Sequence, residues 1–310
     1  MMSQQQYRLV TRSDFDGLVC AVLLNELGMV NEIKFVHPKD MQDGKVEITE
    51  RDITTNLPYV PGAYLAFDHH LSETLRNGQH DNHIIDPSAP SAARVVYDHF
   101  GGKQVFTRIS DEMMEAVDKA DSAQFSRDEI LDPSGWVLLN YLMDARTGLG
   151  RFRNFTVSNY QLMMDLIGYC RDHSIEEILA LPDVKERVDL YRQYQEQARE
   201  QIQRCAQVHG NLLLLDLLQE ETIYPANRFL IYAMYPQCNI SIHMMWGLNK
   251  QNIVFATGKS IIDRSCPTNV GALMLQYGGG GHEAAGTCQI GIEQYEQVRD
   301  ELIARIRADA

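Results

Sequence analysis

The stretch Ala63-Tyr64-Leu65-Ala66-Phe67-Asp68-His69-His70 places an acid and two imidazoles directly after an apolar run. Pro61 and Gly62 precede the run, and a short apolar segment bounded in this way predicts a buried strand. In open α/β sheets, ligands bind at the carboxyl ends of the strands. The triplet therefore indicates a ligand site, with a polar strand end that faces solvent as the alternative for three residues alone.

Two further segments show the same arrangement. Residues 7–10 read as a short strand and lead into Ser13-Asp14-Phe15-Asp16-Gly17, and residues 45–49 read as another strand and lead into Asp52. If these strands are parallel, their carboxyl ends meet at one edge of the sheet and the polar groups converge there. Such a group of acids and imidazoles needs a cation to balance its charge, and a divalent metal is the natural partner.

The composition bounds the class of protein. A chain of 310 residues with 45% hydrophobic residues predicts one large domain or two ordinary ones. A net charge of −14 argues against a protein that coats nucleic acid, but metals and a few arginines can still neutralise a phosphate substrate. Six cysteines without a CxxC pair predict reduced thiols.

The sequence predicts no export signal and no membrane span. Residues 1–6 contain no apolar signal-peptide core, and no apolar run reaches the roughly 18 residues that a membrane span needs. We therefore expect a cytoplasmic protein that does not contact membranes.

The order of predicted elements indicates an α/β fold with a parallel sheet, followed by a second, smaller α/β domain. Residues 17–28, 92–100 and 113–120 have helical spacing, residues 33–37 and 84–86 are strand-like, and residues 136–169 are mainly helical. A new set of strands begins at residues 211–215 and continues at 239–244 and 252–256, before helices at 269–277 and 294–308. Strands that alternate with helices are typical of βαβ units.

A long amphipathic helix is predicted between the two sets of strands. Residues 185–206 carry a narrow apolar stripe, and Gly210 is expected to end the helix. We therefore predict a metal-binding catalytic domain at residues 1–184, a linker helix at 185–210 and a substrate-binding domain at 211–310. The stripe can pack on either domain or on another subunit, which leaves a homodimer open.

Several polar residues allow two interpretations. We expect His37 to be a loop histidine, and His80 and His83 to be surface residues, because no apolar strand delivers that pair to the edge. Ser91 is a plausible N-cap, and the helix it begins could bind a phosphate, although capping alone is favoured. Asp118 and Asp121 lie three apart near a helix end, where either facing the site or facing solvent is consistent with the pattern.

A second candidate site lies in the last hundred residues. Gly278-Gly279-Gly280-Gly281-His282 allows positive φ angles and a close approach of the backbone to a ligand. Successive amide groups can bind an anion, and Arg264 lies upstream. Ligand binding is favoured over a flexible surface turn.

These motifs, in this order and spacing, resemble the DHH phosphoesterase superfamily, in which a DHH domain precedes a DHH-associated domain. Relatives include RecJ exonucleases, oligoribonuclease and pApA phosphatases, cyclic-di-AMP phosphodiesterases and exopolyphosphatase-like proteins. The resemblance covers nearly the whole chain. The motifs that carry it are residues 13–17, Asp52, residues 68–70, Asp121 and residues 278–286.

The resemblance implies two manganese ions, with magnesium as a substitute. One ion would be held by Asp14 and Asp52, and the other by Asp16, Asp52, His69 and Asp121, so that Asp52 bridges the two. His70 would face the substrate phosphate, and Asp68 would orient the imidazoles. The far end of the substrate would be held by Arg264, Gly278, Gly279, Gly280, Gly281 and His282.

One position departs from the family pattern. The family carries His or Asp before the acidic turn as a further ligand of the first metal. The corresponding positions here are Arg12 and Val10, neither of which can ligate. Either the first metal binds loosely, or Arg12 replaces a cation and contacts the phosphate itself.

The predicted function is that of a metal-dependent phosphoesterase, in which hydroxide generated at the metals attacks a phosphodiester or phosphoanhydride bond. Short oligonucleotides, dinucleotides, phosphoadenosine phosphate and short polyphosphate all satisfy the pattern. An inorganic pyrophosphatase is ranked low, because its second domain resembles this one less. The alternative outside enzymes is a nucleotide- or polyphosphate-binding sensor, which the retention of every other ligand argues against.

Overall fold

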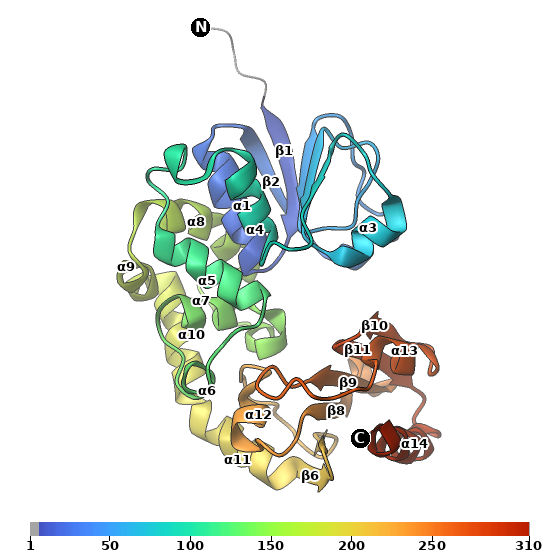
Figure 1. Ribbon diagram of the computed structural model, residues 1–310. Coiled ribbons are helices and arrows are strands. Elements are labelled where there is room, and N and C mark those ends of the chain that lie inside the picture. Colours follow the sequence, from blue (N-terminus) through green and yellow to red (C-terminus); the bar gives the residue numbers. More distant parts are fainter. Residues whose placement is uncertain (1–5, 310) are drawn as a thin grey trace, which may run out of the picture. The chain divides into compact units, whose positions relative to one another are not determined.

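The chain forms two compact units, each built on one sheet (Figure 1). The computed structural model describes residues 6–309, so residues 1–5, in which no signal peptide was expected, lie outside it. The first unit contains the chain up to residue 124 together with Pro133–Leu190, and the second contains Phe125–Asp132 and the chain from Tyr191 onward. The predicted functional boundaries at residues 184 and 210 stay a prediction. Among the described residues, every helix is too short or too polar to span a membrane.

The sheet of the first unit has five parallel strands in the order β2-β1-β3-β4-β5, which confirms the predicted parallel α/β architecture. The strands are β1 (Tyr7–Arg12), β2 (Val30–Val36), β3 (Asp52–Thr55), β4 (Leu65–Asp68) and β5 (His83–Ile85). Because all five run the same way, their carboxyl ends share one edge, which we call the carboxyl edge.

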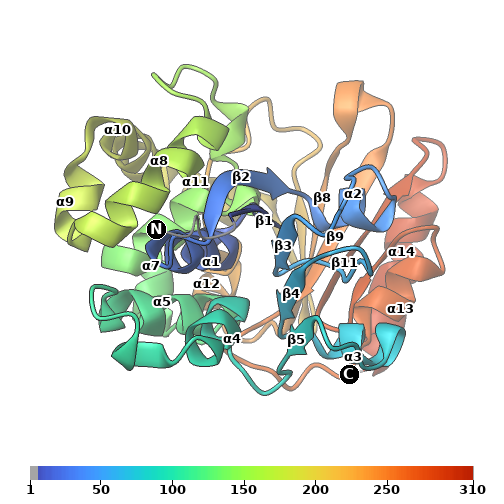
Figure 2. The same cartoon turned by 90° about the horizontal axis from the view of Figure 1, so that it is seen from above.

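Helix α1 (Phe15–Glu26) is the centre of the first unit. Every residue from 15 to 24 is buried, which explains the nearly uniform apolar sequence of this helix. It lies against strand β1 and against helices α4, α5 and α8, as Figure 2 shows from above. The helices of the first unit after α1 are α2 (Pro38–Gln42), α3 (Leu71–Asn77), α4 (Ala92–His99), α5 (Asp111–Asp121), α7 (Gly135–Met143), α8 (Asn159–Asp172) and α9 (Ile175–Ala180).

The predicted strand at residues 45–49 is wrong, and its correction moves Asp52. Residues 45–49 form no strand; instead Val46 and Ile48 pack on a small apolar cluster that includes Val10 and Val36. Apolar residues at every second position produce the same sequence pattern as a half-buried strand, which explains the wrong prediction. The true strand is β3, which begins at Asp52, so Asp52 lies at the amino-terminal end of the sheet. Asn56, which directly follows the carboxyl end of β3, is about 13 Å away along the chain.

The second unit holds a six-stranded mixed sheet in the order β10-β11-β9-β8-β7-β6, in which only the β7–β8 pair is parallel. Helices α13 and α14 supply apolar side chains to its core, together with alternate residues of β7, β8 and β9. The strands are β6 (Ala206–His209), β7 (Leu212–Asp216), β8 (Ile240–Trp246), β9 (Ile253–Lys259), β10 (Gly280–His282) and β11 (Ala285–Ile290). The helices are α6 (Arg127–Leu131), α11 (Gln195–Cys205), α12 (Leu230–Met234), α13 (Val270–Leu275) and α14 (Tyr295–Asp309).

The long helix predicted at residues 185–206 is broken. It comprises α10 (Pro182–Gln193) and α11, with Tyr194 between them at φ −99° and ψ 4°. Helix α11 ends at Cys205, and the following residues form strand β6. Gly210, with φ 68°, makes the turn of the β6–β7 hairpin instead of ending a helix.

Half of the glycine run belongs to a strand, so the less favoured alternative of a flexible surface turn does not describe it. Gly280 and Gly281 belong to strand β10, which pairs with β11. A Cβ atom on Gly279 would lie 2.0 Å from the Thr287 carbonyl oxygen, and one on Gly281 would lie 2.2 Å from the Ala285 carbonyl oxygen. Two of the four glycines are therefore required for contact between backbones within this unit.

Candidate active site

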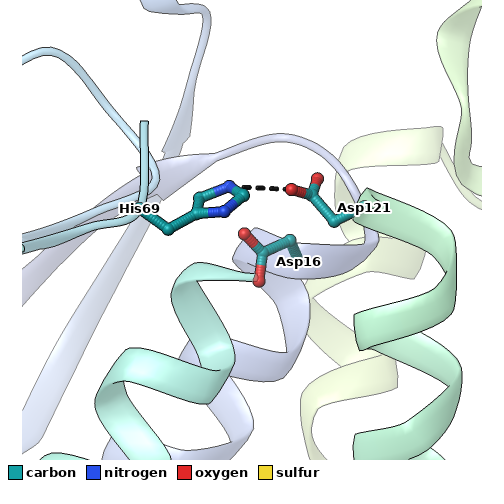
Figure 3. A group of neighbouring side chains, drawn as sticks. All are labelled: Asp16, His69 and Asp121. Atoms are coloured by element: carbon teal, nitrogen blue, oxygen red, sulfur yellow. Dashed lines mark ion pairs between the residues drawn. The ribbon is translucent and has the colours of Figure 1, made fainter. Parts of the chain in front are cut away.

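Three predicted ligands converge at the carboxyl edge. Asp16 lies in the first turn of α1, His69 follows β4 directly, and Asp121 is the last residue of α5 (Figure 3). One donor atom from each lies within 4.8 Å of the other two, and His69 Nε2 is 2.8 Å from Asp121 Oδ2. We call this group the Asp16–His69–Asp121 triad.

Backbone groups hold two members of the triad in place. The amide groups of Ala92 and Ala93, at the start of α4, donate to the Asp16 carboxylate at 3.0 and 2.8 Å. The N-terminus of α4 thus binds a carboxylate of the chain itself, and Ser91 caps the helix as predicted. His69 Nδ1 lies 3.2 Å from the Ala89 carbonyl oxygen, and an N–H group there leaves Nε2 as the ligating atom.

The electrostatics of the triad are those of a cation site. Burial raises the pKa of Asp16 well above its usual value, and the nearby charges of Asp121 and Asp14 add to the effect. Burial lowers the pKa of His69, but the hydrogen bond and charge of Asp121 outweigh it and raise the pKa to about 9. Burial raises the pKa of Asp121, and its contact with His69 reverses this to a net lowering. Without a metal, the imidazolium of His69 supplies the positive charge that these carboxylates need.

The donor set fits a divalent cation. Two carboxylates and one imidazole are ligands that manganese and magnesium-type sites accept, and their net charge of about −2 with a neutral imidazole matches a single ion. His69 Nε2 is buried, and its contact among the described residues is Asp121 Oδ2 at 2.8 Å. A divalent cation bound by both side chains would take the place of this ion pair.

Asp68 and His70 form a second pair beside the triad. Asp68 is 1% exposed, and its Oδ1 lies 2.7 Å from Nδ1 of His70. The carboxylate fixes the imidazole so that Nε2 points away from it. The sequence predicted that Asp68 orients the imidazoles, and the structure shows this contact with His70.

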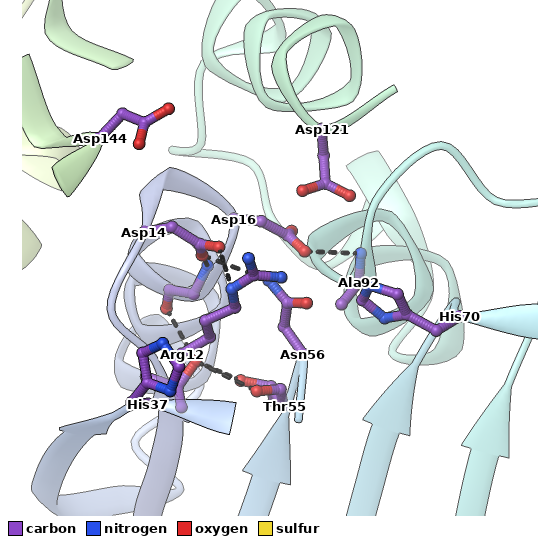
Figure 4. A network of polar contacts seen from close by, with 12 residues as sticks. Arg12, Asp14, Asp16, His37, Thr55, Asn56, His70, Ala92, Asp121 and Asp144 are labelled. Atoms are coloured by element: carbon purple, nitrogen blue, oxygen red, sulfur yellow. Dashed lines mark hydrogen bonds and ion pairs between the residues drawn. The ribbon is translucent and has the colours of Figure 1, made fainter. Parts of the chain in front are cut away.

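Asp14 is not a member of the triad and has partners of its own. It caps α1 by accepting from Gly17 N at 3.0 Å, and its other oxygen lies 2.7 Å from Nε of Arg12 (Figure 4). A Cβ atom on Gly17 would lie 1.9 Å from the Arg12 carbonyl oxygen, so only glycine allows α1 to start this close to β1. The acidic turn therefore brings Arg12, Asp14 and Asp16 to the same edge.

Sequence reasoning missed Asn56, which follows β3 directly at the carboxyl edge. Its φ is 54°, its side chain is 1% exposed, and its Nδ2 donates to Asp14 Oδ1 at 3.2 Å. Asn56 could have been identified from the sequence if strand β3 had been predicted at residues 52–55. Arg146 was also missed. It follows Asp144 in a 3-10 turn, and Asp144 accepts from its Nε at 2.7 Å and from its backbone N at 2.9 Å.

Other candidates lie elsewhere. Asp52 is held by Arg8 and by Thr49 at the amino-terminal end of the sheet, so the structure gives it no place as a bridging ligand. Asp118 accepts hydrogen bonds from Arg94 and from Ser91 and is not a member of the triad. His37 is the N-cap of α2 and accepts from Lys39 N, as expected for a loop histidine.

The two later histidines differ from each other. His80 is exposed, as predicted, whereas the prediction that His83 is a surface residue is wrong, because it is 7% exposed and begins β5. Both rings stack on Tyr59.

The second candidate site remains a prediction. Arg264 and His282 are both exposed in the second unit, and Arg264 Nε donates to the Ile261 carbonyl oxygen at 3.3 Å. Gly280 differs from its neighbours in the glycine run, because a Cβ atom there would meet nothing within 4 Å. The space beside Gly280 is open to a ligand.

Comparison with known proteins identifies relatives among solved structures. No protein-family model and no curated protein matches the chain. The pGpG-specific phosphodiesterase PggH from Vibrio cholerae is 66% identical, with a TM-score of 0.88 over 98% of this chain and 100% of that one.

More distant structures share the fold. A RecJ from Thermus thermophilus in complex with Mn²⁺ is 13% identical, with a TM-score of 0.54, 98% of this chain covered and 52% of that chain. An exopolyphosphatase-related protein from Bacteroides fragilis is 14% identical, with a TM-score of 0.50, 97% of this chain covered and 92% of that chain. With the triad, the oriented His70 and the full-length match to a phosphodiesterase, the chain belongs to the DHH superfamily of metal-dependent phosphoesterases.

Proposed function

We propose that this protein hydrolyses pGpG, a linear dinucleotide with a 5′-phosphate, and that it uses manganese to do so. The observation that supports the substrate most strongly is the 66% identity, over 98% of the chain, with a phosphodiesterase specific for pGpG. A small phosphodiester also agrees with the net charge of −14, which disfavours long nucleic acids.

Manganese is proposed as the metal on two grounds. The triad offers two carboxylates and an imidazole nitrogen, a mixed donor set that suits manganese better than the all-oxygen shell that magnesium prefers. A RecJ of the same fold has been solved with Mn²⁺. When bound, such an ion polarises the phosphoryl oxygens and lowers the pKa of a water molecule.

The residues of the chain have distinct tasks in this proposal. Asp16 and Asp121 hold the ion together with His69, and the α4 amide groups keep Asp16 in position. His70, oriented by Asp68, donates to an oxygen of the scissile phosphate. The oxygen of water bonds to phosphorus, the bond to the ribose 3′-oxygen breaks, and that oxygen takes a proton. Two molecules of GMP result.

The second unit is proposed to contribute to substrate binding. Exposed Arg264 and His282 offer donors for an anion, and Gly280 leaves its backbone accessible. Gly278, Gly279 and Gly281 have no such role in the proposal, because turn geometry and close backbone contacts account for them.

A manganese-supplemented activity panel tests the substrate. Purified enzyme is incubated with pGpG, GpG, pApA or short polyphosphate, and products are separated by chromatography. We expect GMP from pGpG, with kcat/KM at least about 100-fold above that for pApA, because a site built for polar groups of guanine rejects an analogue that lacks them. Equal rates on pGpG and pApA, or faster release of phosphate from polyphosphate, would contradict the proposal. Binding of pGpG without turnover would identify a sensor.

A further inference from the structure

The carboxyl edge contains a positive charge of its own beside Asp14. Arg12 ends β1, and its Nε lies 2.7 Å from Asp14 Oδ2. The second oxygen of Asp14 accepts from Gly17 N and from Asn56 Nδ2. Both oxygens of Asp14 therefore have partners, and its charge is already neutralised by a guanidinium. This contrasts with the triad, in which two carboxylates share one imidazole.

Asn56 occupies the place from which a third strand could have supplied an anionic ligand. It stands at the carboxyl end of β3, between the ends of β1 and β4 in the sheet order. Its Oδ1 is buried and has no hydrogen-bond partner within residues 6–309. Figure 4 shows the Asn56 amide beside the Arg12 guanidinium, on the side of Asp16. Asn56 has φ 54°, in the left-handed region that asparagine tolerates better than most other residues.

Arg146 places a second guanidinium in the same region. Asp144, which holds it, lies across from Asp14 in Figure 4. Burial lowers the pKa of Arg146, but the charges of Asp144, Asp14 and Asp121 raise it overall, which shows that this guanidinium lies in the field of both site carboxylates. Asp14, in turn, feels the positive charge of Arg146.

The net charge of the triad differs from the net charge around Asp14. With a neutral imidazole, the triad carries two negative charges, which one divalent cation balances. At Asp14, one carboxylate faces Arg12, and Arg146 faces Asp144, so the sum is zero. A second divalent cation there would gain one carboxylate that is already shared with Arg12 and one amide oxygen, and it would meet the positive charge of the Arg12 guanidinium.

We propose that this enzyme works with one divalent cation, held by the triad, and that Arg12 and Asn56 replace a second cation beside it. The scissile phosphate would then be bound by the ion on one side and by the Arg12 guanidinium on the other, and the unpartnered Asn56 Oδ1 would be an acceptor beside them. The planar fork of Arg12 binds phosphate oxygens as well as the Asp14 carboxylate. This inference rests on the proposed phosphodiesterase function and specifies how the phosphate is held.

Metal stoichiometry tests the inference independently of activity. Metal-stripped, full-length protein is titrated with Mn²⁺ alone and with Mn²⁺ plus GMP. Bound ions are counted by equilibrium dialysis with elemental analysis, and electron paramagnetic resonance distinguishes isolated from coupled manganese. We expect one ion per chain in both conditions, with the spectrum of isolated Mn²⁺. Two ions per chain, or a spin-coupled pair with GMP present, would overturn the inference.

A double variant tests the two residues directly. Arg12→His with Asn56→Asp removes the guanidinium and supplies a second carboxylate, so we expect two ions per chain and a coupled spectrum. Arg8→His is the matched control, because Arg8 also pairs with an aspartate but at the other end of β1, and one ion should remain. A double variant that folds and still binds one ion would show that other residues set the stoichiometry.

A milder variant covers the case in which the double variant fails to fold. Arg12→Gln keeps a polar side chain, and in the presence of Mn²⁺ we expect it to weaken GMP binding about 10- to 100-fold, as loss of a charge-assisted hydrogen bond does. Unchanged GMP affinity would remove Arg12 from the phosphate site. Two bound ions, or an unchanged GMP affinity, would overturn this inference even if the enzyme hydrolyses pGpG. Absence of pGpG hydrolysis would instead overturn the proposed function.

Discussion

Arg8 and Asp52 form a bidentate ion pair at the amino-terminal end of the first sheet, with Arg8 Nε 2.6 Å from Asp52 Oδ1 and Nη2 3.0 Å from Oδ2. Thr49 donates to the same carboxylate through its backbone N and its hydroxyl. Asp52 is thus fully engaged about 13 Å along β3 from the carboxyl edge. It stabilises the fold and is not positioned to bind a metal with the triad.

Asp52→Asn should therefore destabilise the protein and leave metal binding unchanged. Loss of the negative charge opposite a partly exposed arginine should cost about 2 kcal/mol, less than for a fully buried pair, and lower the Tm by about 4–8 °C. Thermal unfolding and manganese titration measure the two effects. A fall in bound manganese with unchanged Tm would restore Asp52 as a ligand.

The effect of that variant should depend on pH. Burial raises the pKa of Asp52, but the hydrogen bonds and charge of Arg8 and the Thr49 amide lower it overall below its usual value. A carboxylate whose pKa is lower in the folded state stabilises the fold above the unfolded pKa, near 3.9, and loses this contribution as pH falls through the folded value. The difference in unfolding free energy between wild type and Asp52→Asn should be constant near neutral pH and shrink below about pH 4. A difference that grows in acid would contradict the assignment.

Asp121→Asn should remove most metal binding, and Asp118→Asn provides the matched control. Both residues are on α5, but Asp121 contacts His69 whereas Asp118 pairs with Arg94. Loss of a direct ligand should weaken manganese binding by more than the roughly 10- to 100-fold that loss of a supporting residue costs. Calorimetric titration measures the affinity. Equal affinities for the two variants would show that the triad is not the metal site.

Asp68→Asn should reduce turnover without removing the metal. Its carboxylate orients His70 through Nδ1, and an amide at this position can favour the wrong tautomer or ring orientation. We expect kcat to fall about 10- to 100-fold, as for other supporting residues, with unchanged manganese affinity. Asp68→Asn should have no further effect when it is added to His70→Gln, because Asp68 acts only through His70. Additive losses in the double variant would show that the two residues act separately.

Two glycines of the same strand should respond differently to alanine. Gly281 has φ 155° and no room for a Cβ atom, so Gly281→Ala should destabilise the second unit by about 2 kcal/mol or more. Gly280 has open space, so Gly280→Ala should leave the Tm unchanged and raise the KM for pGpG if substrate contacts this backbone. An unchanged KM would remove Gly280 from the substrate site.

A site residue could be assigned to the correct end of the sheet from the sequence only where the strand beside it was identified correctly. The strand that ends before Asp14 and the strand that ends at Asp68 have clear apolar runs, and the parallel sheet followed from their alternation with helices. Asp52 was misplaced because Val46 and Ile48 alternate against a core cluster while the real strand, four residues long, starts at Asp52 itself. That single shift also concealed Asn56.

The glycine run shows a different limit. Repeated glycine predicts permissive backbone, but composition does not distinguish approach to a ligand from approach to another strand. The contacts of Gly279 and Gly281 with β11 became visible only when the β10–β11 pairing was known. The ion pair of Arg12 with Asp14 was foreseeable, because the two residues are close in sequence at a strand end.

The most direct test of the account is GMP formation from pGpG by metal-stripped enzyme as Mn²⁺ is added back, measured for wild type and Asp121→Asn in parallel. The account predicts no product without metal, saturable recovery in the wild type and little recovery in the variant at the same Mn²⁺ concentrations. Full activity of the metal-stripped enzyme, or equal recovery of Asp121→Asn and wild type, would contradict the claim that the Asp16–His69–Asp121 triad holds the metal required for hydrolysis.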